Sequence, residues 1–204
     1  MQDMIIGGSD TSLTIIEWAF SEMLKNPSVM KKAQEEVRQA FGSRGYVDEK
    51  DLQELKYLKA VIKETFRLHS PIPLLLRECT ETCEINGYTI PAGTQVFVNV
   101  WAIGRDQMNW NDADKFSPER FLDSPIDYKG TNFDFIPFGA GKRMCPGALF
   151  AIPTIDLPLA QLLYYFDWQF PSGTSHENFD MTEAFGNAAK RKSELLIIPI
   201  PYNP

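Results

Sequence analysis

The feature that most constrains this chain is the run from Pro137 to Gly147, in which two glycines precede a lone cysteine. Glycine reaches positive φ and lets other atoms approach the backbone closely, so Gly139 and Gly141 predict a tight loop. The proline after Cys145 suits the first turn of a helix, and the apolar residues from Ala148 to Tyr165 predict that helix. The run therefore predicts a loop that presents one cysteine at the start of a long helix.

Periodicity and turn residues predict the remaining elements. Apolar residues recur at helical spacing in three segments ahead of the loop, and a proline or a glycine follows each segment. The predicted helices are residues 5–25, 27–41 and 48–68, with a short one at 101–105 and irregular coil over 107–144. A hairpin is predicted from residues 83–90 and 94–100, joined by a Pro-Ala-Gly turn, and a last strand at 195–198. Because helix dominates and no linker divides residues 1–204, we expect one mainly α unit with small β-sheets, an α+β fold.

Composition excludes some classes of partner and environment. Lys and Arg number 20 against 27 Asp and Glu, and a net charge of −7 argues against nucleic acid or an anionic bilayer as an electrostatic partner. Three cysteines are too few for a disulfide scaffold, so a reducing compartment is expected. No run of about 18–20 consecutive apolar residues occurs, so no membrane-spanning helix is expected within the chain.

The cysteines have more than one interpretation. A free cysteine is most often a small buried hydrophobe, and Cys145 could be that. The same interpretation holds for Cys79 and Cys83 beside the predicted hairpin, since a zinc site would need a second pair of ligands. His69 and His176 do not form one.

Five residues of the cysteine loop stand in a fixed register: Phe138, Gly141, Arg143, Cys145 and Gly147. This register resembles the heme-binding loop of the cytochrome P450 superfamily. The resemblance implies that Cys145 is the thiolate ligand of the iron of heme b and that Arg143 pairs with a propionate. A thiolate ligand favours cleavage of the O–O bond, the step that precedes oxygen insertion. The cofactor-binding residues implied by the resemblance are Arg77, Phe138, Gly139, Gly141, Arg143 and Cys145.

A second motif lies near the start of the chain. Gly7-Gly8-Ser9-Asp10-Thr11-Ser12 resembles the oxygen-binding groove in the central helix of the same superfamily. The spacing lets the Thr11 hydroxyl bond back to the Gly7 carbonyl group, which would open the helix locally. The resemblance implies that Thr11 donates a hydrogen bond at the oxygen site and that Asp10 relays protons. From the residues alone, the glycines could instead form a loop that precedes an ordinary helix N-cap.

Three charged residues form a further match. Glu64 and Arg67 lie three residues apart, within ion-pairing reach on one helix face, and periodicity alone indicates a solvated surface pair. The resemblance instead implies a buried cluster that is completed by Arg120 in Pro118-Glu119-Arg120-Phe121. It also implies that Arg77 pairs with a heme propionate, although Arg77 could be an ordinary strand-edge arginine. His69 is read as structural, not as an iron ligand.

The resemblance covers essentially the whole chain and is closest to microsomal plant enzymes. It implies the C-terminal part of the P450 fold, starting within the oxygen-binding helix, without the N-terminal half and membrane anchor. The implied function is an NADPH- and O2-dependent monooxygenase on the cytosolic face of the endoplasmic reticulum, served by NADPH–cytochrome P450 reductase. It would oxidise a small lipophilic compound such as a terpenoid. Two alternatives remain: a heme-thiolate rearrangement or dehydration enzyme, and a truncated non-catalytic heme-binding protein. The expected substrate-pocket residues are Ile72, Leu74, Leu75 and Phe185.

Overall fold

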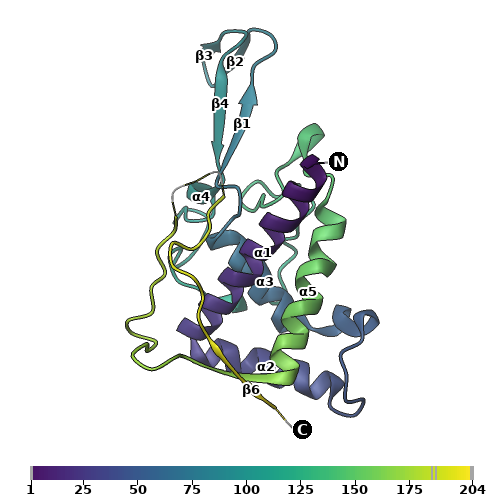
Figure 1. The fold of residues 1–204 in the computed structure, drawn as a ribbon. Coiled ribbons are helices and arrows are strands. Elements are labelled where there is room, and N and C mark those ends of the chain that lie inside the picture. Colours follow the sequence, from purple (N-terminus) through teal and green to yellow (C-terminus); the bar gives the residue numbers. More distant parts are fainter. Residues whose placement is uncertain (1, 185, 187, 203–204) are drawn as a thin grey trace.

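Long helices form the body of the molecule, and a narrow pair of hairpins rises from one end (Figure 1). The computed structural model describes residues 2–184, 186 and 188–202. The long helices are α1 (Gln2–Lys25), α2 (Pro27–Phe41), α3 (Lys56–Leu68) and α5 (Ala148–Tyr165). The first two and the last match their predictions to within a few residues.

The core lies where these four helices meet. Helix α1 contributes Ile15, Ala19 and Met23, which recur at helical spacing and are fully buried. Helix α1 packs against α2, α3 and α5, and α5 also packs against α2. Burying a side chain of leucine size contributes about 1.5–3 kcal/mol, so the shared apolar faces stabilise the bundle. They also fix the ends of α1 and α5 relative to each other.

The third predicted helix is divided in two. Residues Glu49–Glu54 form the 3-10 helix η1, and α3 begins only after Leu55, whose φ of −78° and ψ of 74° are not helical. The carboxylate of Glu36 on α2 accepts hydrogen bonds from the Tyr57 and Leu58 N–H groups at 2.7 and 2.9 Å. A carboxylate at a helix N-terminus satisfies free N–H groups and the helix dipole. Glu36 therefore stabilises the new helix start.

The predicted hairpin is wrong in its pairing. Strand β1 (Leu74–Glu78) pairs with β4 (Gln95–Asn99), and β2 (Cys83–Ile85) pairs with β3 (Tyr88–Ile90), both antiparallel. The tight turn is Asn86-Gly87, where φ is 49° and 81°. Asn-Gly accepts positive φ at both positions and suits a two-residue hairpin turn. The Pro-Ala-Gly segment therefore connects β3 to β4 and does not close the predicted hairpin.

The remaining elements are short. Helix α4 (Val100–Ile103) follows β4, and the predicted coil carries only the 3-10 helices η2 (Pro118–Phe121) and η3 (Gly141–Arg143). Strand β5 (Phe166–Gln169) pairs with β6 (Ile198–Pro201), three residues later than the strand predicted at 195–198.

Helix α5 is the one element among the described residues that is long and apolar enough to cross a membrane by length and composition. Its Leu159, Ala160 and Leu163 side chains are nonetheless fully buried in the protein core. The packing against α1 and α2 accounts for the apolar residues on that face of the helix.

Candidate functional site

The cysteine loop is a closed turn at the start of α5. The Cys145 N–H group donates to the Phe138 carbonyl oxygen at 2.8 Å, which draws the two ends of the loop together. Between them Gly139 and Gly141 have φ of 74° and 68°, a conformation that costs other residues free energy. Cys145 itself is exposed. The interpretation of Cys145 as a buried hydrophobe is therefore wrong in this structure.

Aromatic packing fixes the loop to α3. The Phe138 ring lies 5.1 Å from Phe66 of α3 and 5.7 Å from Tyr128, measured between ring centroids. Burial is the main cause that raises the pKa of the Tyr128 phenol, which therefore stays protonated. Tyr128 in turn contacts Phe135, and Phe135 contacts Phe121. The cysteine loop thus rests on a continuous aromatic layer, in which Phe66, Phe121 and Phe135 are buried and Phe138 and Tyr128 are partly buried.

Strand β1 lies against the same loop. A Cβ atom added at Gly139 would lie 3.7 Å from Leu75 Cδ1 and 3.8 Å from Arg77 Nη2. The structure therefore brings Arg77 and Leu75 together with the cysteine loop. The Arg77 Nη1 atom also donates to the Leu76 carbonyl oxygen at 2.8 Å, which holds the guanidinium beside its own strand.

The other residues predicted to contact heme or substrate differ in their exposure. Ile72 and Leu74 are exposed. Arg143 is exposed on η3. Phe185 lies outside the described residues.

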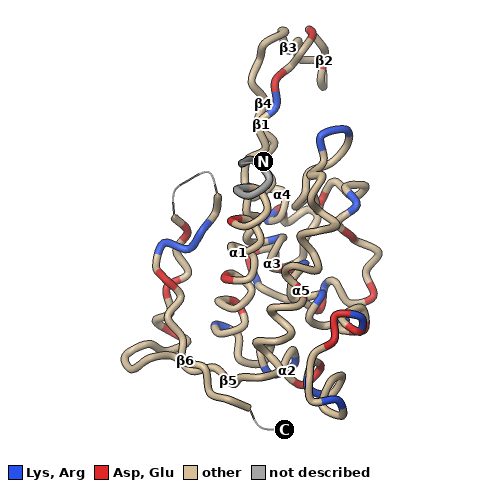
Figure 2. Tube along the Cα trace, turned by 45° about the vertical axis from the view of Figure 1, so that its right-hand side comes forward, with Lys and Arg blue, Asp and Glu red and all other residues tan. Residues whose placement is uncertain are grey.

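The motif near the start of the chain lies within α1. Because α1 begins at Gln2, Gly7 and Gly8 are helical and the interpretation as a loop before an N-cap is wrong. The Thr11 hydroxyl donates to the Gly7 carbonyl oxygen at 2.6 Å, the hydrogen bond predicted from their spacing. The Asp10 carboxylate forms an ion pair with Lys190 at 2.8 Å. The start of α1 and the start of α5 lie at the same end of the molecule (Figures 1 and 2).

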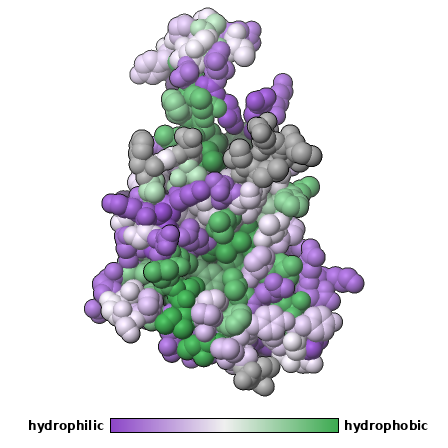
Figure 3. All heavy atoms as spheres, in the orientation of Figure 1, coloured by the Kyte–Doolittle hydropathy of each residue, from purple (hydrophilic) through white to green (hydrophobic). Residues whose placement is uncertain are grey.

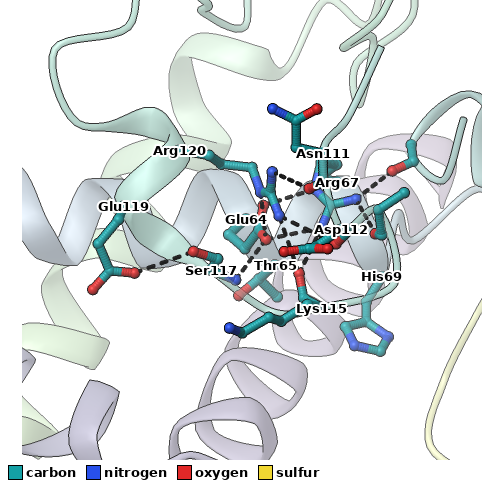
Figure 4. A network of polar contacts seen from close by, with 12 residues as sticks. Glu64, Thr65, Arg67, His69, Asn111, Asp112, Lys115, Ser117, Glu119 and Arg120 are labelled. Atoms are coloured by element: carbon teal, nitrogen blue, oxygen red, sulfur yellow. Dashed lines mark hydrogen bonds and ion pairs between the residues drawn. The ribbon is translucent and has the colours of Figure 1, made fainter. Parts of the chain in front are cut away.

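A buried charge cluster joins α3 to η2 (Figure 4). Arg67 binds both carboxylate oxygens of Glu64, with distances of 2.7 and 2.8 Å, and Arg120 Nε lies 2.9 Å from Glu64 Oε1. The Ser117 N–H group donates to the same oxygen at 2.7 Å. Glu64 and Arg67 are fully buried, so the interpretation of a solvated surface pair is wrong. Periodicity misled because the irregular coil covers this face of α3.

Sequence reasoning missed Gly104, at the end of α4. A Cβ atom at this position would collide with the Arg67 carbonyl oxygen, so only glycine fits without movement. The Gly104 carbonyl oxygen accepts a hydrogen bond from Arg67 Nη1, which also donates to Ala113 at 2.6 Å. A Gly-Arg dipeptide after a short helix gives no sequence signal for this contact.

His69 belongs to a second buried polar group. Its ring stacks on Trp18 with 3.9 Å between centroids, and its Nε2 atom lies 2.7 Å from Glu22 Oε1. Glu183 Oε1 lies 3.4 Å from Nδ1, and its interaction with His69 is the main cause that lowers the pKa of Glu183. Within the described part of the chain, no three His, Cys, Asp or Glu side chains are placed to hold a metal ion.

Comparison with known proteins gives the family. The sequence profile of the cytochrome P450 family matches residues 1–196. The chain belongs to the cytochrome P450 family. Desmethyl-deoxy-podophyllotoxin synthase of Sinopodophyllum hexandrum is 58% identical over 97% of the chain. Premnaspirodiene oxygenase of Hyoscyamus muticus is 53% identical over 99%, and tabersonine 16-hydroxylase 2 of Catharanthus roseus is 56% identical over 96%.

These matches cover only part of the relatives. The chain spans 39 to 40% of the length of these three plant P450s. Among solved structures, a zebrafish cytochrome P450 with abiraterone superposes with a TM-score of 0.87 and 27% identity. That match covers the whole of this chain and 46% of the zebrafish chain. The mainly α architecture with small sheets is therefore that of part of the P450 fold, as expected from the sequence.

The residues around the loop fit the heme that the family implies. Cys145 supplies an exposed thiol, and Arg77 supplies a guanidinium for a carboxylate group beside the loop. Gly139 and Gly141 have no side chains, so the backbone of the loop allows a close approach by another group. An apolar face is also present: Leu149 and Phe150 are exposed on the first turn of α5. A flat macrocycle with two carboxylates matches this set of groups.

Proposed function

We propose that the chain is the C-terminal, heme-binding part of a P450 monooxygenase, with Cys145 as the thiolate ligand of heme b. The observation that carries the proposal is the exposed Cys145 on a loop closed by its own N–H bond to Phe138. Heme bound through a thiolate supplies oxygen activation by favouring O–O cleavage. The residues of this chain hold that group and control the protons around it.

The loop residues suit the task of holding a thiolate. Cys145 stands just before α5, so the helix dipole favours the negative charge on its sulfur. Arg77 on β1 and Arg143 on η3 would pair with the propionates, and the proximity of the Arg77 guanidinium to Gly139 supports this role for Arg77. Phe138 anchors the loop to α3, so the sulfur is held on a rigid base.

Helix α1 supplies the proton-handling residues of the proposal. Thr11 holds its hydroxyl on the Gly7 carbonyl oxygen, and a hydroxyl in that position can turn to donate toward a ligand. Asp10 would bring protons from solvent after releasing Lys190. The Cβ positions of Gly7 and Gly8 meet no atom of the described residues within 4 Å, which leaves space beside Thr11.

The proposed substrate is a small lipophilic plant metabolite, such as a terpenoid. Leu75 offers an apolar contact beside the loop, and Ile72, Leu74 and Phe185 would join it in the proposed pocket. The relatives named above are a synthase, an oxygenase and a hydroxylase of plants. We propose that electrons come from NADPH through NADPH–cytochrome P450 reductase at the endoplasmic reticulum membrane. Under the proposal the N-terminal half of the fold and the membrane anchor lie outside these 204 residues.

The test is the carbon monoxide difference spectrum of the reduced full-length protein. A thiolate-ligated heme gives a red-shifted Soret band, and Cys145→Ser should abolish that band while Cys83→Ser leaves it unchanged. The matched control removes a thiol from the β2–β3 hairpin and leaves the cysteine loop unchanged. A thiolate-type band that persists in Cys145→Ser would refute the assignment of the ligand. Loss of NADPH-dependent turnover with an intact band would instead refute only the monooxygenase step.

A further inference from the structure

Two cysteines meet where the two hairpins join, far along β1 from the cysteine loop. The sulfur atoms of Cys79 and Cys83 lie 3.5 Å apart, and Cys83 is exposed. Figure 1 shows this junction at the top of the molecule, where β1 passes into β2. Neither thiol has a part in the proposed heme chemistry.

The backbone on either side of the pair is fixed by two different ladders. The Cys79 N–H group donates to the Thr94 carbonyl oxygen at 2.9 Å, and the Cys79 carbonyl oxygen accepts from the Gly93 N–H group at 2.7 Å. These bonds extend the β1–β4 ladder by one residue. Cys83 lies opposite Ile90 in the β2–β3 ladder. A bond between the sulfurs would therefore join one ladder to the other.

The short connection between the cysteines is itself ordered by hydrogen bonds. The Thr82 hydroxyl accepts from the Ala92 N–H group at 3.2 Å, which ties this connection to the segment before β4. The Cys79 thiol lies 2.9 Å from the Glu81 carbonyl oxygen. A disulfide needs a sulfur separation of about 2.0 Å. The sulfurs must therefore approach by about 1.5 Å, and rotation of the two side chains would supply that movement under the proposal below.

The surroundings of the pair make it slow to react. The hydrogen bond between Cys83 and Cys79 is the main cause that raises the pKa of Cys83, and the Glu81 charge acts in the same direction. Only the thiolate attacks a disulfide, so oxidation at neutral pH is slow and accelerates as the pH rises. Such a pair is preserved as a dithiol in a reducing compartment and responds to sustained oxidation.

We propose that Cys79 and Cys83 are a redox modification site that forms an intramolecular disulfide and locks the β2–β3 hairpin onto the β1–β4 ladder. The oxidant is a low-molecular-weight disulfide of the glutathione type. One thiolate attacks it, forms a mixed disulfide and releases one glutathione thiolate. The second cysteine attacks the mixed disulfide and releases the other glutathione. Two electrons pass to the glutathione disulfide, and the two thiol protons end on the two glutathione thiols.

Peptide mass spectrometry tests the bond directly. Trypsin releases residues 78–105 as one peptide that contains both cysteines and no other. The full-length protein is incubated with glutathione disulfide and a chelator, quenched in acid, alkylated and digested without reduction. We expect a peptide lighter by two hydrogen atoms that resists alkylation. Two alkylated cysteines, or a stable glutathione adduct on each, would overturn the proposal.

A relocated thiol is the matched control. Neighbouring strand residues point to opposite faces, so Cys83→Thr combined with Glu84→Cys keeps the number of thiols and turns one away from Cys79. This double variant should form mixed disulfides with glutathione and no internal disulfide. The single variant Cys83→Ser should likewise carry glutathione on Cys79. Equal disulfide formation in the double variant would show that the observed geometry is irrelevant and would sink the proposal.

Hydrogen exchange tests the lock. The amides of residues 84–90 should exchange several-fold more slowly in the oxidised protein than in the dithiol, because the disulfide restricts opening of the outer hairpin. Cys83→Ser, treated with the same oxidant, should show no slowing. Unchanged exchange in a protein shown to carry the disulfide would refute the lock. Both outcomes are independent of heme.

Discussion

Substituting Glu64 by glutamine tests the buried charge cluster most directly. Glu64→Gln preserves the shape of the side chain and removes the only negative charge shared by Arg67 and Arg120 in their hydrogen-bonded group. The side chains of Glu64 and Arg67 are 0% exposed, and that of Arg120 is 13% exposed. Water therefore cannot replace the lost carboxylate at Arg67.

The expected loss of stability follows from these exposures. Breaking a buried ion pair by removing one partner costs about 3–5 kcal/mol. The glutamine oxygen can still accept one hydrogen bond, and Arg67 retains backbone carbonyl partners at Ala113 and Lys115. We therefore expect a decrease of about 3 kcal/mol in the free energy of unfolding, at the low end of that range. This is a large part of the usual 5–15 kcal/mol of a domain.

Urea unfolding of the full-length protein measures the effect, with circular dichroism and tryptophan fluorescence required to coincide. Glu119→Gln is the matched control, because Glu119 is 44% exposed and pairs with Lys32 at 2.7 Å. Exposed pairs contribute about 0–1 kcal/mol, and the control should stay within that range. Combining Glu64→Gln with Arg120→Gln should cost less than the sum of the two single changes. A Glu64→Gln protein within about 1 kcal/mol of the parent would refute the reasoning.

Two further predictions concern the core. Burial raises the pKa of Asp156 on α5 to about 6, and the Lys59 charge offsets only part of this shift. The folded state then binds the proton more tightly than the unfolded chain, so stability falls as the pH rises from about 4 to 6. Asp156→Asn should remove that slope and raise the free energy of unfolding at about pH 7.5 by about 3 kcal/mol; a slope unchanged in the variant would contradict the assignment. Gly104→Ala should cost about 1–3 kcal/mol in chemical denaturation, because its Cβ atom meets the Arg67 carbonyl oxygen. Gly8→Ala, inside α1 with open space around it, should gain about 1 kcal/mol, and equal effects of the two substitutions would count against the packing explanation.

The sequence predicts the helices well and the sheets poorly. Helix α5 matches its predicted bounds because its apolar residues and the preceding proline are local signals. The start of α3 was missed because its carboxylate partner, Glu36, lies on another helix. The strand pairing was missed because both Asn86-Gly87 and the Pro-Ala-Gly segment are turn signals, and only tertiary packing places β1 beside β4.

In the candidate site, too, local features could be predicted from the sequence and contacts between distant segments could not. The Thr11 hydrogen bond to Gly7 follows from a spacing of four residues, so it could be predicted. The burial of Glu64 and Arg67 could not be derived from periodicity, because the covering segment is coil with no period of its own. Only the family resemblance placed Arg120 with them. Gly104 gave no signal, since its partner is a backbone carbonyl group distant in sequence.

The buried cluster of Glu64, Arg67 and Arg120 and the coil over residues 107–144 depend on each other for hydrogen-bond partners. Irregular coil pressed against a protein core leaves backbone carbonyl groups without ladder partners, which is unfavourable. Arg67 and Arg120 bring many N–H donors to that region and bind the carbonyl oxygens of Asn111, Ala113 and Lys115 at 2.6 to 3.3 Å. Glu64 then balances the charge that these donors bring. One carboxylate on α3 thus allows two arginines to order a coil that has no regular structure, and that coil leads into the cysteine loop.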